Sequence, residues 1–180
     1  KETETLADHL KYENLGLMRH AGKSTNYAAT YGAQGPTIAR SAGVAEEVGE
    51  LLHQSYWERN WSLKAIADEC IVKNSRGMKW LWNPVAQLWI YLKAEKDRFS
   101  TLNQSTGTFA FDRWVYYILE QRPQLTAQFH DEVILELLKG YREQMTAILN
   151  SAMDSVNKEL GLNVDLGCDI EFGDHYGAIH

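Results

Sequence analysis

The sequence is poor in cysteine and proline, and it has no long apolar run. Its two cysteines, Cys70 and Cys168, are too isolated for a disulfide framework or a structural zinc site, which favours a reducing compartment. Because no run reaches about 18 apolar residues, we expect no membrane-spanning helix and no membrane partner. The chain starts at Lys1 with no charged-then-apolar leader, so we expect an internal start within a longer or processed gene product.

Large apolar side chains are abundant, and charge is uneven along the chain. The sequence has six Trp, nine Tyr and five Phe, which excludes a disordered tail because these groups need a core. The formal net charge is −6, yet residues 72–122 hold eight basic and only four acidic residues. The acidic total weighs against a nonspecific nucleic-acid coat, but it allows an enzyme with a local basic groove and a carboxylate cluster.

The periodicity of apolar residues predicts an α+β fold in which helices come first and an antiparallel sheet with helices packed on one face follows. The predicted elements are helices over 13–31, 44–59 and about 62–70, with Ser62 as an N-cap, a hairpin near 78–92, a helix over 104–120, a hairpin over 125–137, a helix over 141–160 that ends at Gly161, and a strand over 164–172.

A first motif combines cationic and aromatic residues at steps of four. Arg19, Lys23, Tyr27 and Tyr31 are followed directly by Gly32. On a helix this spacing places the side chains in one gently winding stripe. An Arg and a Lys one turn apart can both reach a polyphosphate, and a Tyr one turn further can pack on a sugar. The spacing alone fits a solvated basic pair beside core tyrosines equally well.

A second motif places His130, Asp131 and Glu132 at a tight turn between two apolar strands. Adjacent carboxylates repel each other, and a divalent cation such as Mg²⁺ offsets that repulsion. An ordinary surface turn is the alternative interpretation of this motif alone.

Together, the two motifs resemble motifs B and C of family A DNA polymerases, and the resemblance extends over nearly the whole chain. Residues 101–107 (TLNQSTG) are similar to the family's Asn/Gln motif, and the tail at 174–180 (DHYGAIH) resembles the ends of phage members. The resemblance implies a fingers-like helical region over 1–98 with a hairpin near 78–92. It also implies a palm-like region over 99–180, which carries part of an antiparallel sheet.

The resemblance implies a role for each residue of the first motif. Arg19 and Lys23 would hold the incoming dNTP, and Lys23 would also donate a proton to pyrophosphate. Tyr27 would stack on the sugar. Tyr31 and Gly32 would lie where the templating base is tested and would contact DNA.

It implies roles for the later motifs as well. Asn103 or Gln104 would read the minor groove of the primer–template through acceptors that all base pairs share. His130 would approach the primer terminus. Asp131 and Glu132 would be the catalytic carboxylates and would bind two Mg²⁺ ions, or Mn²⁺ in their place, for attack of the primer 3′-hydroxyl on the α-phosphate. The cationic stripe and the carboxylate turn would face each other across a nucleotide-sized gap.

Three departures from the family pattern limit the resemblance. Ala28 stands where the family usually has Gly, and Asn103 and Gln104 are adjacent where the family commonly has three residues between them. Motif A, which carries the other metal-binding Asp, is absent, because residues 1–12 hold Asp8 without a strand pattern. We therefore expect the chain alone to be inactive, with a second polypeptide or a removed upstream segment supplying motif A, a thumb and possible exonuclease functions.

The expected function is that of a DNA polymerase, and the expected compartment is the cytoplasm of a phage-infected bacterium. Two other functions remain as alternatives. A single-subunit RNA polymerase fragment has a similar cationic helix and His-Asp turn, although Tyr27 and Glu132 favour DNA. A noncatalytic DNA-binding subunit is the alternative from another class, and the intact charged residues of both motifs argue against it.

Two further features have more than one interpretation. The cluster of Trp80, Trp82, Trp89 and Tyr91 favours a packed hairpin over a base-stacking surface, although Lys93, Lys96 and Arg98 follow it directly. Arg113 could reach DNA or form an ion pair.

Overall fold

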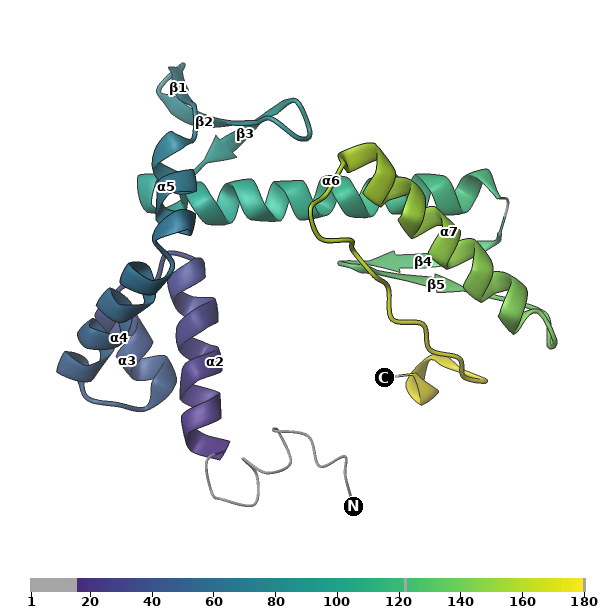
Figure 1. Ribbon diagram of the computed structural model, residues 1–180, viewed down its shortest axis with the longest axis horizontal. Coiled ribbons are helices and arrows are strands. Elements are labelled where there is room, and N and C mark those ends of the chain that lie inside the picture. The colour runs from purple at the N-terminus through teal and green to yellow at the C-terminus, as the bar shows by residue number, and fades with distance from the viewer. Residues whose placement is uncertain (1–15, 122, 180) are drawn as a thin grey trace. The chain divides into compact units, whose positions relative to one another are not determined.

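A computed structural model describes residues 16–121 and 123–179 and confirms the α+β class (Figure 1). The described residues divide into two compact units. The first unit extends to Gln104 and the second begins at Ser105. Because the division falls inside one helix, the units are described separately.

From residue 16 onward, the described part of the first unit begins with four helices: α2 (Gly16–Thr30), α3 (Gly35–Ala42), α4 (Glu46–Arg59) and α5 (Trp61–Glu69). Pro36 occupies the first turn of α3, where its missing N–H costs nothing. Gly43, in a left-handed conformation, ends the same helix. Ala29, Ile38 and Tyr56 form the buried core between α2, α3 and α4.

The crossing of α3 and α4 requires a residue without a side chain. Gly49 is buried, and a Cβ atom placed on it would lie 2.5 Å from the Cβ of Ala39 and 2.5 Å from the carbonyl oxygen of Gly35. These distances are shorter than any real contact, so glycine lets the two helices approach closely enough to seal the core beneath α2.

A three-stranded antiparallel sheet follows, made of β1 (Val72–Ser75), β2 (Met78–Asn83) and β3 (Leu88–Leu92) in that order. The hairpin predicted near 78–92 is confirmed as β2 and β3, whereas β1 was not predicted. Leu81 pairs with Ile90, and Lys79 pairs with Leu92. Leu81 and Leu92 lie on the same face of the sheet, and both are fully buried.

The helix α6 (Arg98–Glu120) begins directly after the short 3-10 turn η1 (Glu95–Asp97). The predicted start near Gln104 is therefore wrong by six residues. Lys79 and Arg98 both form ion pairs with Glu95, which anchors this start to β2. The mostly polar residues at 100–108 interrupt the apolar periodicity, so the sequence pattern did not indicate the first turns of α6.

The second unit contains the rest of α6 together with β4 (Leu125–Phe129), β5 (Glu132–Leu135), α7 (Arg142–Leu160) and the 3-10 turn η2 (Tyr176–Ala178). Its core joins α6 to α7, and half-buried residues of β5 pack against it. Trp114 lies at the centre and donates its indole N–H to the carbonyl of Leu149 at 3.1 Å. Figure 1 shows α7, β4 and β5 beside this half of α6.

The strand predicted over 164–172 is wrong. This segment has no strand partner, and the side chain of Asn157 on α7 instead exchanges two hydrogen bonds with the backbone of Leu166. Cys168 and Ile170 pack against the core of α6 and α7. The apolar residues at 168 and 170 therefore reflect packing against helices rather than pairing in a sheet, whereas Val164 and Leu166 are exposed.

Smaller differences concern element ends. Asn60, not Ser62, lies at the N-cap of α5, and no side chain caps that helix. β5 begins at Glu132, which pairs with Phe129, and it ends at Leu135, two residues before the predicted end of the hairpin. The predicted ends of β3 at Leu92 and of α7 at Gly161 are confirmed. The helices in the described ranges include none with the length and apolar character needed to cross a membrane.

Candidate functional site

The cationic and aromatic residues of α2 form an exposed stripe. Arg19 and Lys23 are exposed, and the side chain of Tyr27 is 57% exposed. Residues on the opposite side of the helix are buried, with Ala29 at the core of the first unit. The ammonium group of Lys23 lies 5.8 Å from the centre of the Tyr27 ring, within the range of a cation–π contact. The stripe thus offers two cations and one aromatic ring to solvent.

At the end of α2, the chain makes a close turn at Gly32. This residue is buried with φ +79°, a conformation that glycine adopts without strain. A Cβ atom here would lie 3.1 Å from the carbonyl oxygen of Lys96. The ammonium group of Lys96 donates to the carbonyl of Gly32 at 3.3 Å. The turn after α2 is therefore fastened to the segment that begins α6.

Two of the predicted site motifs meet beside this turn. The side-chain amide of Gln104 donates to the hydroxyl of Tyr31 at 2.8 Å, although 73 residues separate them. Asn103 is exposed and, as the preceding residue on a helix, points about 100° away. Because only Gln104 reaches the tyrosine, the two adjacent amides have different environments. The structure thus brings Tyr31, Gly32 and Gln104 together.

The carboxylate motif forms the two-residue turn between β4 and β5. Phe129 pairs with Glu132, so His130 and Asp131 form the loop, and Glu132 is the first residue of β5. His130 has φ +51°, an uncommon conformation for a residue with a side chain, and its ring lies 4.4 Å from that of Phe129. Asp131 is exposed at the tip. A tight turn therefore presents the imidazole and the carboxylate together.

Glu132 differs from Asp131 in its surroundings. It is half-buried, and the hydroxyl of Tyr176 in η2 donates a long hydrogen bond of 3.4 Å to its carboxylate. Partial loss of hydration raises the pKa of Tyr176, and the nearby negative charge of Glu132 raises it further. At neutral pH the phenol is therefore protonated and acts as a donor. The tail of the chain thus reaches the carboxylate turn.

The donor set of this turn suits a hard divalent cation only in part. Asp131 and Glu132 provide two carboxylates, and Mg²⁺ in phosphoryl-transfer sites is commonly bound by one or two carboxylates plus phosphate oxygens. Among the residues that the structure describes, no group of three or more His, Cys, Asp or Glu side chains could hold a metal ion. The turn therefore offers two carboxylates, too few for a cation site made of side chains alone.

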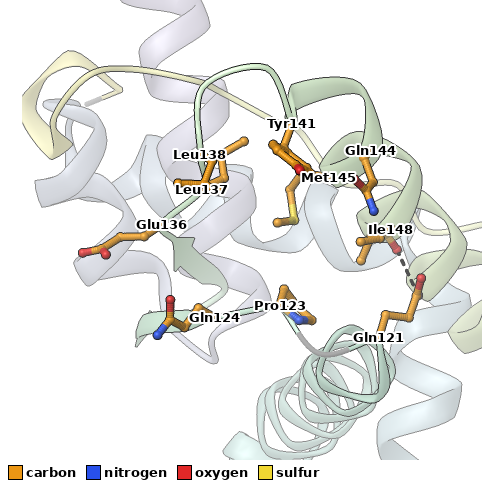
Figure 2. A pocket seen from close by; sticks show the side chains of 10 residues that line it. All are labelled: Gln121, Pro123, Gln124, Glu136, Leu137, Leu138, Tyr141, Gln144, Met145 and Ile148. Carbon is orange, nitrogen blue, oxygen red and sulfur yellow. Dashed lines mark hydrogen bonds between the residues drawn. The ribbon is translucent and has the colours of Figure 1, made fainter.

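A pocket of about 220 Å³ lies in the second unit, at the end of the hairpin opposite the His130–Asp131 turn. Its walls are formed by residues before β4, after β5 and along the first half of α7 (Figure 2), namely Gln121, Pro123, Gln124, Glu136, Leu137, Leu138, Tyr141, Gln144, Met145 and Ile148. Gln121 closes one side by donating to the carbonyl of Ile148 at 3.5 Å. The pocket includes none of the predicted site residues.

The ion pair expected as one interpretation of Arg113 is present within the second unit. The guanidinium group of Arg113 pairs with Glu159 of α7 at 2.8 Å and also contacts the hydroxyl of Tyr117. The hydrogen bond that Arg113 donates to Glu159 raises the pKa of Arg113, and the same contact lowers the pKa of Glu159. The ion pair therefore links α6 to α7.

Sequence reasoning missed two residues that support the site. Lys96 holds the turn at Gly32, and Tyr176 contacts Glu132. The signals for Tyr176 were an aromatic residue in a polar tail and the resemblance of that tail to the ends of phage polymerases, and neither pointed to Glu132. Lys96 gave no signal beyond its positive charge, because 64 residues separate it from Gly32.

Comparison with known proteins gives no family for the chain. No protein-family model matches the sequence, and no curated protein matches it significantly.

Proposed function

We propose that this chain is the C-terminal part of a template-directed DNA polymerase of the family A type. The observation that carries the proposal is the hydrogen bond between Tyr31 and Gln104. The resemblance places one of these residues where the templating base is tested and the other at the primer–template minor groove. Their contact supports a single DNA-facing surface built from two motifs that are distant in the sequence.

The exposed stripe on α2 supports binding of the nucleotide. Arg19 offers a planar fork for a phosphate, and Lys23 one turn away offers a compact charge. Tyr27 provides a half-exposed ring for the sugar. In this role Lys23 also donates the proton that the pyrophosphate leaving group needs. These side chains hold and orient a triphosphate.

The carboxylate turn supports the second half of the proposal. Asp131 and Glu132 would hold Mg²⁺, which when bound offsets charge on the phosphates and activates the primer 3′-hydroxyl. His130 lies beside Asp131 in the same turn and would orient the primer terminus. Because the sequence lacks motif A, the proposal includes a second polypeptide or an upstream segment that supplies the other aspartate. The cytoplasm of a bacterial host is the proposed compartment.

Nucleotide binding tests the proposal without the missing segment. We expect a fluorescent dNTP to bind the full chain in the presence of Mg²⁺ and primer–template DNA, and Arg19→Ala to weaken that binding. Arg40→Ala is the matched control, because it removes the same charge from an exposed position on α3 in the same unit. Equal binding by the wild type and both variants would contradict the assignment of the stripe.

Primer extension tests the catalytic part. We expect no extension by the chain alone, and extension when a polypeptide that carries motif A is added. Asp131→Ala should abolish the reconstituted activity, whereas full activity of that variant would favour a noncatalytic DNA-binding subunit. Competition between ribonucleotides and deoxyribonucleotides separates an RNA polymerase fragment from a DNA polymerase. Since Tyr rather than Phe at the sugar position accompanies use of dideoxynucleotides in the family, Tyr27→Phe should increase discrimination against them.

A further inference from the structure

The three-stranded sheet of the first unit has two chemically different faces. Leu81, Leu92 and Asn83 are fully buried on one face. Cross-strand partners point to the same side of a sheet and successive residues alternate, so the residues between them occupy the other face. Those residues are Lys73, Trp80, Trp82, Trp89 and Tyr91. We call this second face the aromatic face.

The aromatic face consists of two cross-strand rows. Lys73, Trp80 and Tyr91 form one row across all three strands, and Trp82 and Trp89 form the next. The rings of Trp80 and Tyr91 meet edge to face at 6.0 Å, and those of Trp82 and Trp89 are tilted at 5.3 Å. These contacts fix the orientation of the rings. A rigid aromatic surface needs little ordering when a flat ligand binds.

Part of the aromatic face remains accessible to solvent after the rings pack against one another. Tyr91 is 52% exposed, and Met78 at the end of the face is 42% exposed. The ammonium group of Lys73 lies 3.7 Å from the centre of the Trp89 ring and is itself exposed. A cation therefore lies over one ring of the aromatic face, and the same face carries a tyrosine that is half exposed.

The charge of the sheet identifies the kind of ligand. Residues 71–93 contain four basic residues, Lys73, Arg76, Lys79 and Lys93, and no Asp or Glu, in a chain whose net charge is −6. Lys79 pairs with Glu95 beyond the sheet. Among the described residues, no ion pair engages the other three cations, and all three are exposed. The local positive charge thus accompanies the aromatic face.

We propose that the aromatic face of β1–β3 binds single-stranded nucleic acid, with a base stacked on Tyr91 and phosphates held by Lys73 and the flanking cations. Unpaired bases offer flat faces for stacking, and their phosphates require positive charge. A groove or surface that combines both features is how proteins bind single strands without sequence preference. The proposal does not depend on the assignment of a polymerase. It adds a contact outside the residues given to the nucleotide and the primer.

The test measures binding of labelled dT20 and rU20 to the full chain by fluorescence anisotropy over a range of salt concentrations. Tyr91→Ala should weaken binding by about ten-fold, because one stacked base is lost. Tyr91→Phe should retain affinity, since the ring rather than the hydroxyl does the stacking. Lys73→Gln should reduce the slope of log K against log salt by about 0.7, as expected for one lost phosphate contact on a single strand.

Matched controls lie on α5 in the same unit. Trp61 is 71% exposed, and Lys64 is exposed beside Asp68, so Trp61→Ala and Lys64→Gln remove similar groups away from the sheet. Both variants should bind like the wild type. The proposal is supported if the substitutions in the sheet weaken binding of either oligonucleotide and the substitutions on α5 do not.

Three results would overturn the proposal. The first is that neither oligonucleotide binds measurably. The second is that the sheet variants and the control variants lose the same affinity. The third is that duplex DNA binds as tightly as the single strands and that Tyr91→Ala does not change this binding. The last result would indicate charge without stacking. Failure here is distinguishable from failure of the proposed function, because the two are measured separately: oligonucleotide anisotropy reports on the sheet, and binding of the fluorescent dNTP reports on the stripe of α2.

Discussion

Substitution of Gly32 by alanine tests whether the turn after α2 depends on glycine. At φ +79° an alanine is in the left-handed region, which costs about 1–2 kcal/mol for an L residue. The added methyl carbon would also lie 3.1 Å from the backbone oxygen of Lys96 and 3.2 Å from a carboxylate oxygen of Asp97. Alanine also lowers the conformational entropy of the unfolded chain, which offsets about 0.4–1 kcal/mol of this cost. We therefore expect Gly32→Ala to reduce the free energy of unfolding by roughly 1–3 kcal/mol when crowding is included.

The backbone contact decides this magnitude. The carboxylate of Asp97 can rotate, although it is paired with Lys96 at 3.1 Å, whereas a carbonyl oxygen moves only with its chain. Relief of the clash must therefore separate the end of α2 from η1. That movement lengthens the hydrogen bond between Tyr31 and Gln104, so the substitution should also weaken binding of primer–template DNA if the proposed function is correct.

Urea denaturation followed by tryptophan fluorescence measures the effect, and Gly22→Ala is the control on the same helix. A Cβ atom at Gly22 meets nothing within 4 Å, so alanine there should stabilise α2 by about 0.5–1 kcal/mol. The two substitutions make the same chemical change and should have opposite signs. Equal stability of Gly32→Ala and the wild type would refute the reasoning, as would a loss from Gly22→Ala of the same size.

Three further substitutions test individual contacts. Gly49→Ala should destabilise the first unit by about 2–3 kcal/mol in urea denaturation, since its Cβ would overlap α3, and an unchanged midpoint would contradict the close crossing. Glu159→Gln should cause a smaller loss at pH 7. The pKa of Glu159 is lowered in the folded state, so the difference in free energy of unfolding between the wild type and this variant should reach its full size above pH 4.5. The difference should disappear as the pH falls through the folded pKa. A constant difference from pH 3 to 7 would exclude the ion pair with Arg113 as its cause. His130→Gly should raise stability by about 0.5 kcal/mol in thermal unfolding, because glycine relieves the conformation at φ +51°, and destabilisation would show that the imidazole contacts matter more.

The sequence predicted elements well where local chemistry determines them. The apolar and aromatic run at 88–92 specifies β3, and Gly161 ends α7, because backbone preference and turn chemistry act over a few residues. The polar strand β1 was missed, since its pattern of Val72, Lys73, Asn74 and Ser75 has no apolar alternation and pairing with β2 alone makes it a strand. The strand predicted over 164–172 was wrong, because Cys168 and Ile170 have the spacing of a strand but pack against the core of α6 and α7.

The candidate site shows the same division between local and distant contacts. The stripe on α2 and the turn at His130 follow from spacing and strand pairing, and both could be predicted as geometry. The hydrogen bond between Tyr31 and Gln104 could not, because it depends on how the turn at Gly32 is fastened to η1. Adjacency of Asn103 and Gln104 left their roles open in the sequence. The structure distinguishes them because consecutive residues on a helix point in different directions.

The two carboxylates of the β4–β5 turn are equivalent in the sequence but not in the fold. Asp131 lies in the loop and is exposed, so its oxygens can turn toward a cation without disturbing the hairpin. Glu132 is the first residue of β5, and its carboxylate accepts a hydrogen bond from Tyr176. Loss of that acceptor to a metal would leave the phenol without this partner, whereas recruitment of Asp131 has no such cost. Under the proposed function, Asp131 is therefore expected to be the primary ligand, whereas Glu132 contacts Tyr176 and links the turn to the tail of the chain.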